Sequence, residues 1–192
     1  AGMDLKVERF GAMEVLPGES SVSLELLAER LGVVDRLVKG DAPDLIVAPI
    51  QALMQSVPDP QTLTRFGLTL NAGGQISQGD LLAWLDRAGY QRTDAIEQPG
   101  DFAVRGGIVD IFAAAGSFRN IDGSDAGETS NAIRLDFFGD QIETTHLVAP
   151  DTLGSRQKLA SVRLIGADTK TLLSDAGATN LLQLLPGVLP VL

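Results

Sequence analysis

The sequence predicts an α/β layer into which a smaller α+β domain is inserted. Strand-like and helix-like segments alternate over residues 1–60, which is typical of an α/β layer. Residues 61–149 are dominated by short alternating segments separated by turn residues, which is typical of β-hairpins. Proline-containing stretches near Pro58 and Pro150 mark the two transitions. We therefore expect residues 1–60 and 150–192 to form the layer, and 61–149 to form the inserted domain.

The first part of the layer contains one clear amphipathic helix. From Val22 to Val38, apolar residues recur at helical spacing, and Gly40 follows where a C-terminal cap belongs. Residues 44–48 form a short apolar run of the buried-strand type, and residues 50–55 predict a short helix. A short strand is expected around Val7, ahead of the long helix.

The inserted domain reads as a strand, a helix and then several strands. Ser77 and Asp80 resemble a capping box at the start of the helix. Residues 113–131 are rich in Gly, Ser, Ala, Asp and Asn and predict a long loop. The expected strands after the helix are 102–104, 108–112, 133–137 and 141–148, the last two joined by a turn at Gly139-Asp140. The expected core comprises Phe66, Leu85, Phe102, Val104, Ile108, Leu135 and Phe137. Helical spacing favours the core over an edge position for Trp84, whereas Tyr90 and Phe138 are left open between packing and partner contact.

The return to the layer contains a strand over residues 161–165 and a short helix over 180–185, ahead of Pro186. The composition then limits the function. The chain has no Cys, one His and a net charge of −10, so thiolate metal sites and cysteine nucleophiles are excluded. The acidic balance disfavours a large phosphate-binding surface. No apolar run is long enough to span a membrane, and we expect an intracellular piece of a longer protein.

Catalytic groups are scarce. His146 has no Ser or Asp at a spacing that indicates a catalytic set, and a strand residue is the favoured interpretation. Asp136, Asp140 and Glu143 lie in one hairpin, but paired carboxylates do acid–base chemistry only when their pKa values are pushed apart. The phosphate-loop pattern of nucleotide-binding proteins is absent. We predict no catalytic residue, no metal site and no cofactor.

A group of charged residues on the predicted strands indicates binding instead. Arg92 and Arg105 flank a turn at Pro99-Gly100, and a hairpin there would bring both guanidiniums to one surface. Arg134 and Asp136 are two residues apart, so they share a face of the next strand. Such a face is suited to bidentate recognition of a partner's carboxylates. From the residues alone, a weak salt-bridge ladder is the favoured alternative.

Three blocks of sequence resemble a known family. They are Gly89-Tyr90-Gln91-Arg92, the run from Gly100 to Phe112, and the run from Ile133 to Glu143. These blocks resemble the UvrB family and, more closely, the UvrB-like N-terminal region of bacterial transcription-repair coupling factors. The departure Phe102-Ala103-Val104-Arg105-Gly106, which lacks one arginine of UvrB sequences, and the single Tyr favour the coupling-factor branch.

The resemblance implies a UvrB domain 2-like insertion in an incomplete, degenerate helicase-like layer that resembles UvrB domain 1. It also implies that this chain binds UvrA, the ATPase that searches for DNA damage, through Arg92, Arg105 and Asp136, with Arg134 beside them. The parent would be an ATP-dependent DNA translocase in the bacterial cytoplasm, and other parts of it would contact DNA and RNA polymerase. The fragment is expected to be monomeric. The alternatives are a UvrB-type fragment that also contacts DNA and, less favoured, an enzyme.

Overall fold

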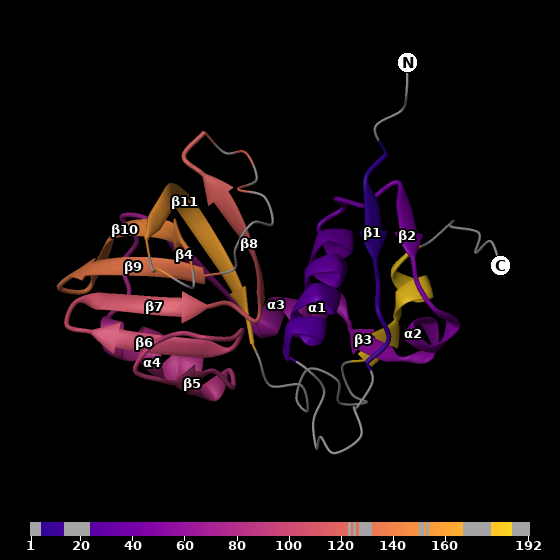
Figure 1. Cartoon of the computed structure of the whole chain (residues 1–192), viewed down its shortest axis with the longest axis horizontal. Helices are drawn as coiled ribbons and strands as arrows, with labels where there is room; N and C mark the ends of the chain where they lie inside the picture. The colour runs from indigo at the N-terminus through magenta and orange to yellow at the C-terminus, as the bar shows by residue number, and fades with distance from the viewer. Residues whose placement is uncertain are drawn as a thin grey trace. The chain divides into compact units, whose positions relative to one another are not determined.

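The computed structural model describes residues 5–13, 24–122, 124, 126, 132–149, 152, 154–166 and 178–185. These residues form two compact units. Unit 1 comprises the described residues up to Arg65 together with those from Ala178 onward, and unit 2 runs from Phe66 to Gly166 (Figure 1). Unit 2 is therefore an insertion within the sequence of unit 1.

Unit 1 is a small mixed structure. Its elements are β1 (Val7–Arg9), α1 (Leu24–Val38), β2 (Leu45–Val47), α2 (Ile50–Met54), β3 (Ser56–Pro58), α3 (Pro60–Arg65), β12 (Ala178–Asn180) and the 3-10 helix η2 (Leu181–Leu184). β1 and β2 pair in parallel and are connected through α1, whereas β3 and β12 pair antiparallel. The predicted long helix is confirmed. It buries Leu27, Leu31 and Val34, and Gly40 ends it with a φ of 80°, a conformation that glycine adopts without strain.

Unit 2 is mostly sheet, with one helix. Its elements are β4 (Gly67–Asn71), α4 (Gln78–Arg87), β5 (Gln91–Arg92), β6 (Asp101–Arg105), β7 (Ile108–Phe112), β8 (Ala115–Asn120), β9 (Ala132–Phe138), β10 (Gln141–Val148) and β11 (Ser155–Ile165). The strand order is β4-β11-β10-β9-β7-β6-β5, and β8 also pairs with β11. The sheet curls into a half-barrel (Figure 1). Its outermost pairing, β4 with β11, is antiparallel and sets Gly67 opposite Ile165.

The core of unit 2 lies between α4 and one face of the sheet. Leu81 and Leu85 of α4 are completely buried against a cluster that includes Phe102, Ile133 and Leu135. The expected core residues Phe66, Trp84, Val104, Ile108 and Phe137 are only partly buried. Tyr90, which the sequence left open between packing and partner contact, is a core residue, and its ring lies in the cluster 6.1 Å from that of Trp84.

The predicted cap of α4 is confirmed. The Ser77 hydroxyl accepts a hydrogen bond from the Asp80 backbone N–H at 3.0 Å. Since this N–H has no partner within the helix, we expect Ser77→Ala to destabilise unit 2 by about 1 kcal/mol. For a domain of about 100 residues this lowers the Tm by roughly 5 °C. Calorimetry checks the value, and Ser77→Asn, which retains an acceptor, should melt close to the parent. Equal melting of Ser77→Ala and the parent would show that the cap contributes nothing.

The sequence missed one strand and assigned another, correctly predicted, to the wrong unit. The predicted loop over 113–131 contains β8, which pairs with β11 and buries Phe118. Its small residues carry little strand propensity, and pairing with a long neighbour specifies it instead. The predicted strand over 161–165 is part of β11, which pairs with β10, β8 and β4. The inserted domain therefore extends beyond residue 149, past the boundary that we expected at Pro150.

Candidate functional site

A charged face lies on the side of the sheet opposite α4. On β9, Ile133 and Leu135 enter the core, so the alternating Arg134 and Asp136 leave the sheet on the other side. The same alternation applies on β7 and β6, where Val109, Ile111, Phe102 and Val104 face the core. Among the residues that these strands turn away from the core, four define what we call the charged face: Arg105, Asp110, Arg134 and Asp136.

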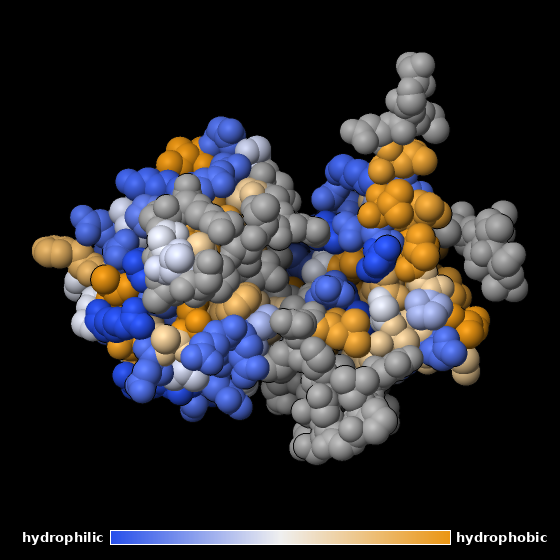
Figure 2. Space-filling view, viewed as in Figure 1, coloured by the Kyte–Doolittle hydropathy of each residue, from blue (hydrophilic) through white to orange (hydrophobic). Residues whose placement is uncertain are grey.

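The strand register brings these residues into two adjacent rows across the sheet. One row runs from Arg105 through Ile108 to Asp136, and the next runs from Ala103 through Asp110 to Arg134. In the space-filling view, hydrophilic and hydrophobic side chains are intermixed on the visible face of unit 2 (Figure 2). Because neighbouring strands are about 4.8 Å apart, the two rows span a compact area on a stiff support.

Asp110 lies at the centre of the charged face. Its side chain is 1% exposed, and its two oxygens accept hydrogen bonds from Arg134, Nε at 2.7 Å and Nη2 at 3.0 Å. Nη1 of Arg105 lies 3.5 Å from the same carboxylate. One buried carboxylate therefore holds two guanidiniums, and the bidentate pair with Arg134 fixes the plane of that guanidinium.

The two arginines keep donors for a partner. Arg105 is 48% exposed in its side chain, and its Nη2 donates to the Asp94 carbonyl at 2.9 Å. Arg134 is 23% exposed, and only two of its five N–H groups point at Asp110. The hydrogen bonds that Arg134 donates to Asp110, aided by the charges of Asp110 and Asp136, raise the pKa of the Arg134 guanidinium. Both arginines are therefore cations with N–H groups available to acceptors.

Asp136 closes the face on the β10 side. Its carboxylate accepts a hydrogen bond from the Thr144 hydroxyl at 2.5 Å, and Nδ1 of His146 lies 3.6 Å away. This contact places His146 next to the charged face, although the sequence suggested no companion for it. A fixed acid beside two fixed cations makes the face complementary to a partner surface of mixed charge.

The expected hairpin between Arg92 and Arg105 is wrong. β5 and β6 pair in parallel, with Arg92 opposite Phe102. Residues paired in register point to the same side of a sheet, and Phe102 faces the core. The register therefore sets Arg92 on the α4 side of the sheet, at its exposed edge, away from the charged face. A turn signal at Pro99-Gly100 does not distinguish a hairpin from a wider loop that returns in parallel.

Two further residues belong with the face: Asp110, which sequence reasoning did not select, and Phe138, which it left open between packing and partner contact. Asp110 is the only charged residue in the strand Ile108–Phe112, and a carboxylate within an apolar strand needs a buried partner. Phe138 is 78% exposed and follows Asp136 on the same side of β9. Two consecutive phenylalanines in a strand cannot both face one core, which was the available signal for Phe138.

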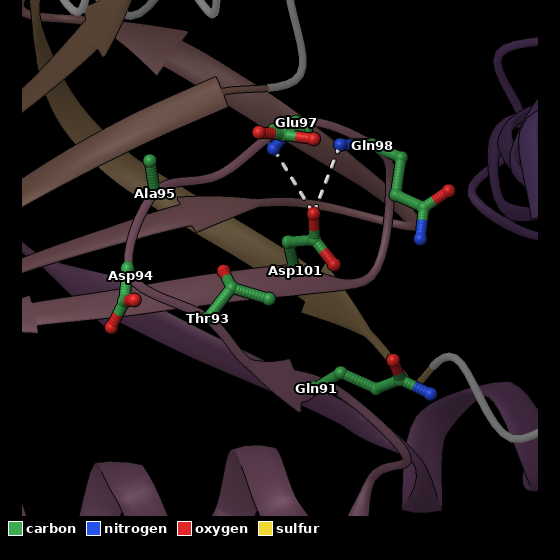
Figure 3. A pocket seen from close by; sticks show the side chains of 7 residues that line it. All are labelled: Gln91, Thr93, Asp94, Ala95, Glu97, Gln98 and Asp101. Carbon is green, nitrogen blue, oxygen red and sulfur yellow. Dashed lines mark hydrogen bonds between the residues drawn. The ribbon is translucent and has the colours of Figure 1, made fainter.

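An open, polar pocket adjoins the charged face. It is lined by Gln91, Thr93, Asp94, Ala95, Glu97, Gln98 and Asp101 (Figure 3). The buried Asp101 carboxylate accepts hydrogen bonds from the Glu97 and Gln98 backbone N–H groups, each at 3.0 Å. Asp101 therefore fixes the loop that contains Asp94, whose carbonyl in turn holds Arg105. Because the Asp101 carboxylate is hydrogen-bonded within its own loop, the pocket supports the charged face by holding that loop in place.

The three hairpin carboxylates lie in different surroundings. Asp140 and Glu143 are exposed, whereas Asp136 is hydrogen-bonded to Thr144. Within the described ranges, no group of three or more His, Asp or Glu side chains is arranged to hold a metal ion. Among the helices that the structure describes, none is long and apolar enough to cross a membrane. The geometry at the site is suited to binding between surfaces.

Unit 2 is a protein-interaction domain of a known family. The family model of the UvrB interaction domain matches residues 68–169, and the chain belongs to this family. The match covers unit 2 from β4 to β11 and includes the whole charged face.

The chain is similar to proteins of at least two kinds. The chain is 28% identical over 162 residues to the transcription-repair-coupling factor of Bacillus subtilis and 29% identical over 171 residues to that of Myxococcus xanthus, covering 84% and 88% of this chain. It is 30% identical over 141 residues, or 73% of the chain, to the UvrABC system protein B of Ralstonia nicotianae. The matched regions amount to 13%, 13% and 18% of these relatives, so the chain spans a small part of their length.

Proposed function

We propose that this chain is a non-catalytic part of a transcription-repair coupling factor, and that it binds UvrA through the charged face. The observation that carries the proposal is one buried carboxylate, Asp110, holding two arginines outward within the region that matches the UvrB interaction domain. The binding recruits nucleotide excision repair to a stalled RNA polymerase. The residues proposed to meet UvrA are Arg105, Arg134 and Asp136.

The chemistry of the face predicts the chemistry of the partner surface. Guanidinium N–H groups that remain free favour carboxylates on UvrA, whereas Asp136 favours a lysine or arginine. Phe138 adds an exposed ring next to the charges, and aromatic and arginine side chains together are typical of binding hot spots. Because Arg105 is about half exposed, the interaction should weaken as salt is added.

The proposal also covers unit 1 and the parent protein to which this chain would belong. Unit 1 is proposed to be part of a degenerate helicase-like α/β layer, similar to domain 1 of UvrB, that carries unit 2. The parent is an ATP-dependent DNA translocase of the bacterial cytoplasm, whose other parts contact DNA and RNA polymerase. The chain itself acts as a monomer, and the proposal assigns it no cofactor and no membrane contact.

A UvrB-type fragment that contacts DNA is the second candidate, because the UvrABC system protein B is also among the relatives. The net charge of −10 opposes it, since a DNA-binding surface needs a basic stripe. Gel-shift titration with duplex and damaged DNA at about 150 mM salt separates the two candidates. Binding of DNA by the chain without UvrA would favour the UvrB-type fragment.

The direct test is a calorimetric titration of the chain into UvrA at two salt concentrations. The proposal expects a saturable complex that is weaker at the higher salt concentration. A chain that melts cooperatively but shows no heat of binding and no comigration with UvrA would contradict the proposal. Arg92, which the family resemblance assigns to the same interface, is tested in the same titration as Arg92→Ala.

Phe138 provides a prediction independent of charge. We expect Phe138→Ala to weaken UvrA binding by about tenfold, because an exposed aromatic at a hot spot loses its buried area in the complex. Stability should hardly change, since the ring is 78% exposed in the free chain. Ile121→Ala is the matched control, because Ile121 is a 71% exposed apolar residue of unit 2 that the proposal leaves outside the interface. Equal losses in both variants would argue against a specific contact by Phe138.

A further inference from the structure

We propose that Asp110 is the positioning residue of the charged face: it does not contact UvrA but aims Arg105 and Arg134 at it. This inference rests on the proposed function. Asp110 is 1% exposed, so its carboxylate is covered by the sheet and by the two arginines. A buried group of this kind acts on a partner only through the side chains that it holds.

Asp110 holds the two arginines in different ways. Arg134 meets both oxygens of Asp110, at 2.7 Å and 3.0 Å, and this fork arrangement fixes the orientation of the guanidinium plane. Arg105 meets one oxygen at 3.5 Å and is held on its other side by the Asp94 carbonyl. The orientation of the Arg134 guanidinium is thus fixed, whereas that of Arg105 is restrained between the Asp110 carboxylate and the Asp94 carbonyl.

The carboxylate also sets the electrostatic balance of the face. Two guanidiniums on neighbouring rows repel each other, and Asp110 between them lowers that cost. Ordering both long side chains before UvrA arrives reduces the conformational entropy lost on binding. The affinity for UvrA therefore depends on Asp110 only while the arginines are present, which distinguishes positioning from direct contact.

A double-mutant cycle tests this dependence. The cycle compares the parent, Asp110→Asn, the pair Arg105→Ala with Arg134→Ala, and the combination of all three changes, each titrated into UvrA. We expect Asp110→Asn to weaken binding about tenfold in the parent. The same change should have less than about a threefold effect once both arginines are gone. Losses that simply add in the triple variant would overturn the proposal.

Asp35→Asn is the matched control. Asp35 is also a buried carboxylate, at 2% exposure, and it pairs with Lys39, but it lies on α1 in unit 1 and is not part of the charged face. Loss of this carboxylate should lower the Tm while UvrA affinity stays within about twofold of the parent. If Asp35→Asn weakens binding as much as Asp110→Asn does, buried-charge loss acts through stability alone and the proposal is wrong.

A second pair of variants covers the case in which Asp110→Asn does not fold. Arg134→Met with Asp110→Asn removes the buried ion pair as a whole, a replacement that is often tolerated. Against Arg134→Met alone, this variant should bind UvrA about threefold or more weakly, because Arg105 has lost its anchor. Equal affinities would refute a positioning role. If the parent itself fails to bind UvrA, it is the proposed function that fails.

Discussion

Replacing Arg105 and Arg134 together by alanine should weaken UvrA binding by at least about a hundredfold. Truncating one partner of a desolvated charge pair costs about 2–5 kcal/mol, and here two cations are lost from one face. Part of the cost arises inside the chain, since Asp110 is left buried without a counter-ion. Calorimetric titration measures the loss, and a thermal melt separates the loss of contacts from the loss of folded protein.

Charge-matched single variants show whether the effect belongs to this face. Arg105→Ala should bind more weakly than the parent, whereas Arg87→Ala should bind equally well, because Arg87 is exposed on α4 at the other side of the sheet. Arg92→Ala distinguishes the geometry from the family resemblance. The register predicts a small effect for Arg92, and an effect as large as that of Arg105 would mean that UvrA reaches around the edge strand β5.

Tyr90→Phe should destabilise unit 2 by about 3 kcal/mol, although it removes a single oxygen. The Tyr90 hydroxyl donates to the Ile165 carbonyl at 2.8 Å and accepts from the Ala114 N–H at 3.2 Å, with the side chain 3% exposed. The substitution leaves both backbone groups buried without these partners. Because the hydroxyl ties β11 to the segment between β7 and β8, the Tm should fall by more than about 10 °C.

The same residue predicts how stability depends on pH. Burial raises the pKa of the Tyr90 phenol above its ordinary value of 10.0. A raised pKa of an acid means that stability is present below pH 10 and is lost as pH increases, by about 1.4 kcal/mol per pH unit. Tyr90→Phe should not show this loss. The chain has one Tyr, so the tyrosinate absorbance reports this group alone, and a folded-state titration near its ordinary value would contradict the prediction.

The sequence predicted elements whose patterns are local. The amphipathic period fixed α1 and α4, and alternation with a Gly139-Asp140 turn fixed the β9–β10 hairpin. It did not predict β8, whose position depends on pairing with β11, a neighbour distant in the chain. Such pairing is decided by tertiary contacts rather than by the propensity of residues 115–120.

The same distinction between local patterns and contacts distant in the chain applies to the residues of the candidate site. Arg134 and Asp136 could be placed on one face because two residues of one strand suffice to fix it. Arg92 could not, since the direction of β5 relative to β6 depends on the path of the loop between them. Asp110 was missed because its importance lies in contacts with two other strands, to Arg105 on β6 and to Arg134 on β9, the latter 24 residues along the chain.

The pairing of Gly67 with Ile165 has a consequence for how unit 2 can be combined with other proteins. Residues facing each other in an antiparallel ladder have Cα atoms about 5 Å apart. The chain therefore enters unit 2 at Gly67 and leaves it at Ile165 at two points that nearly coincide. A surface hairpin of an unrelated host offers the same spacing. Unit 2 can thus be inserted into another protein without distorting the backbone of that protein. A host that tolerates an inserted loop should tolerate unit 2 at the same position.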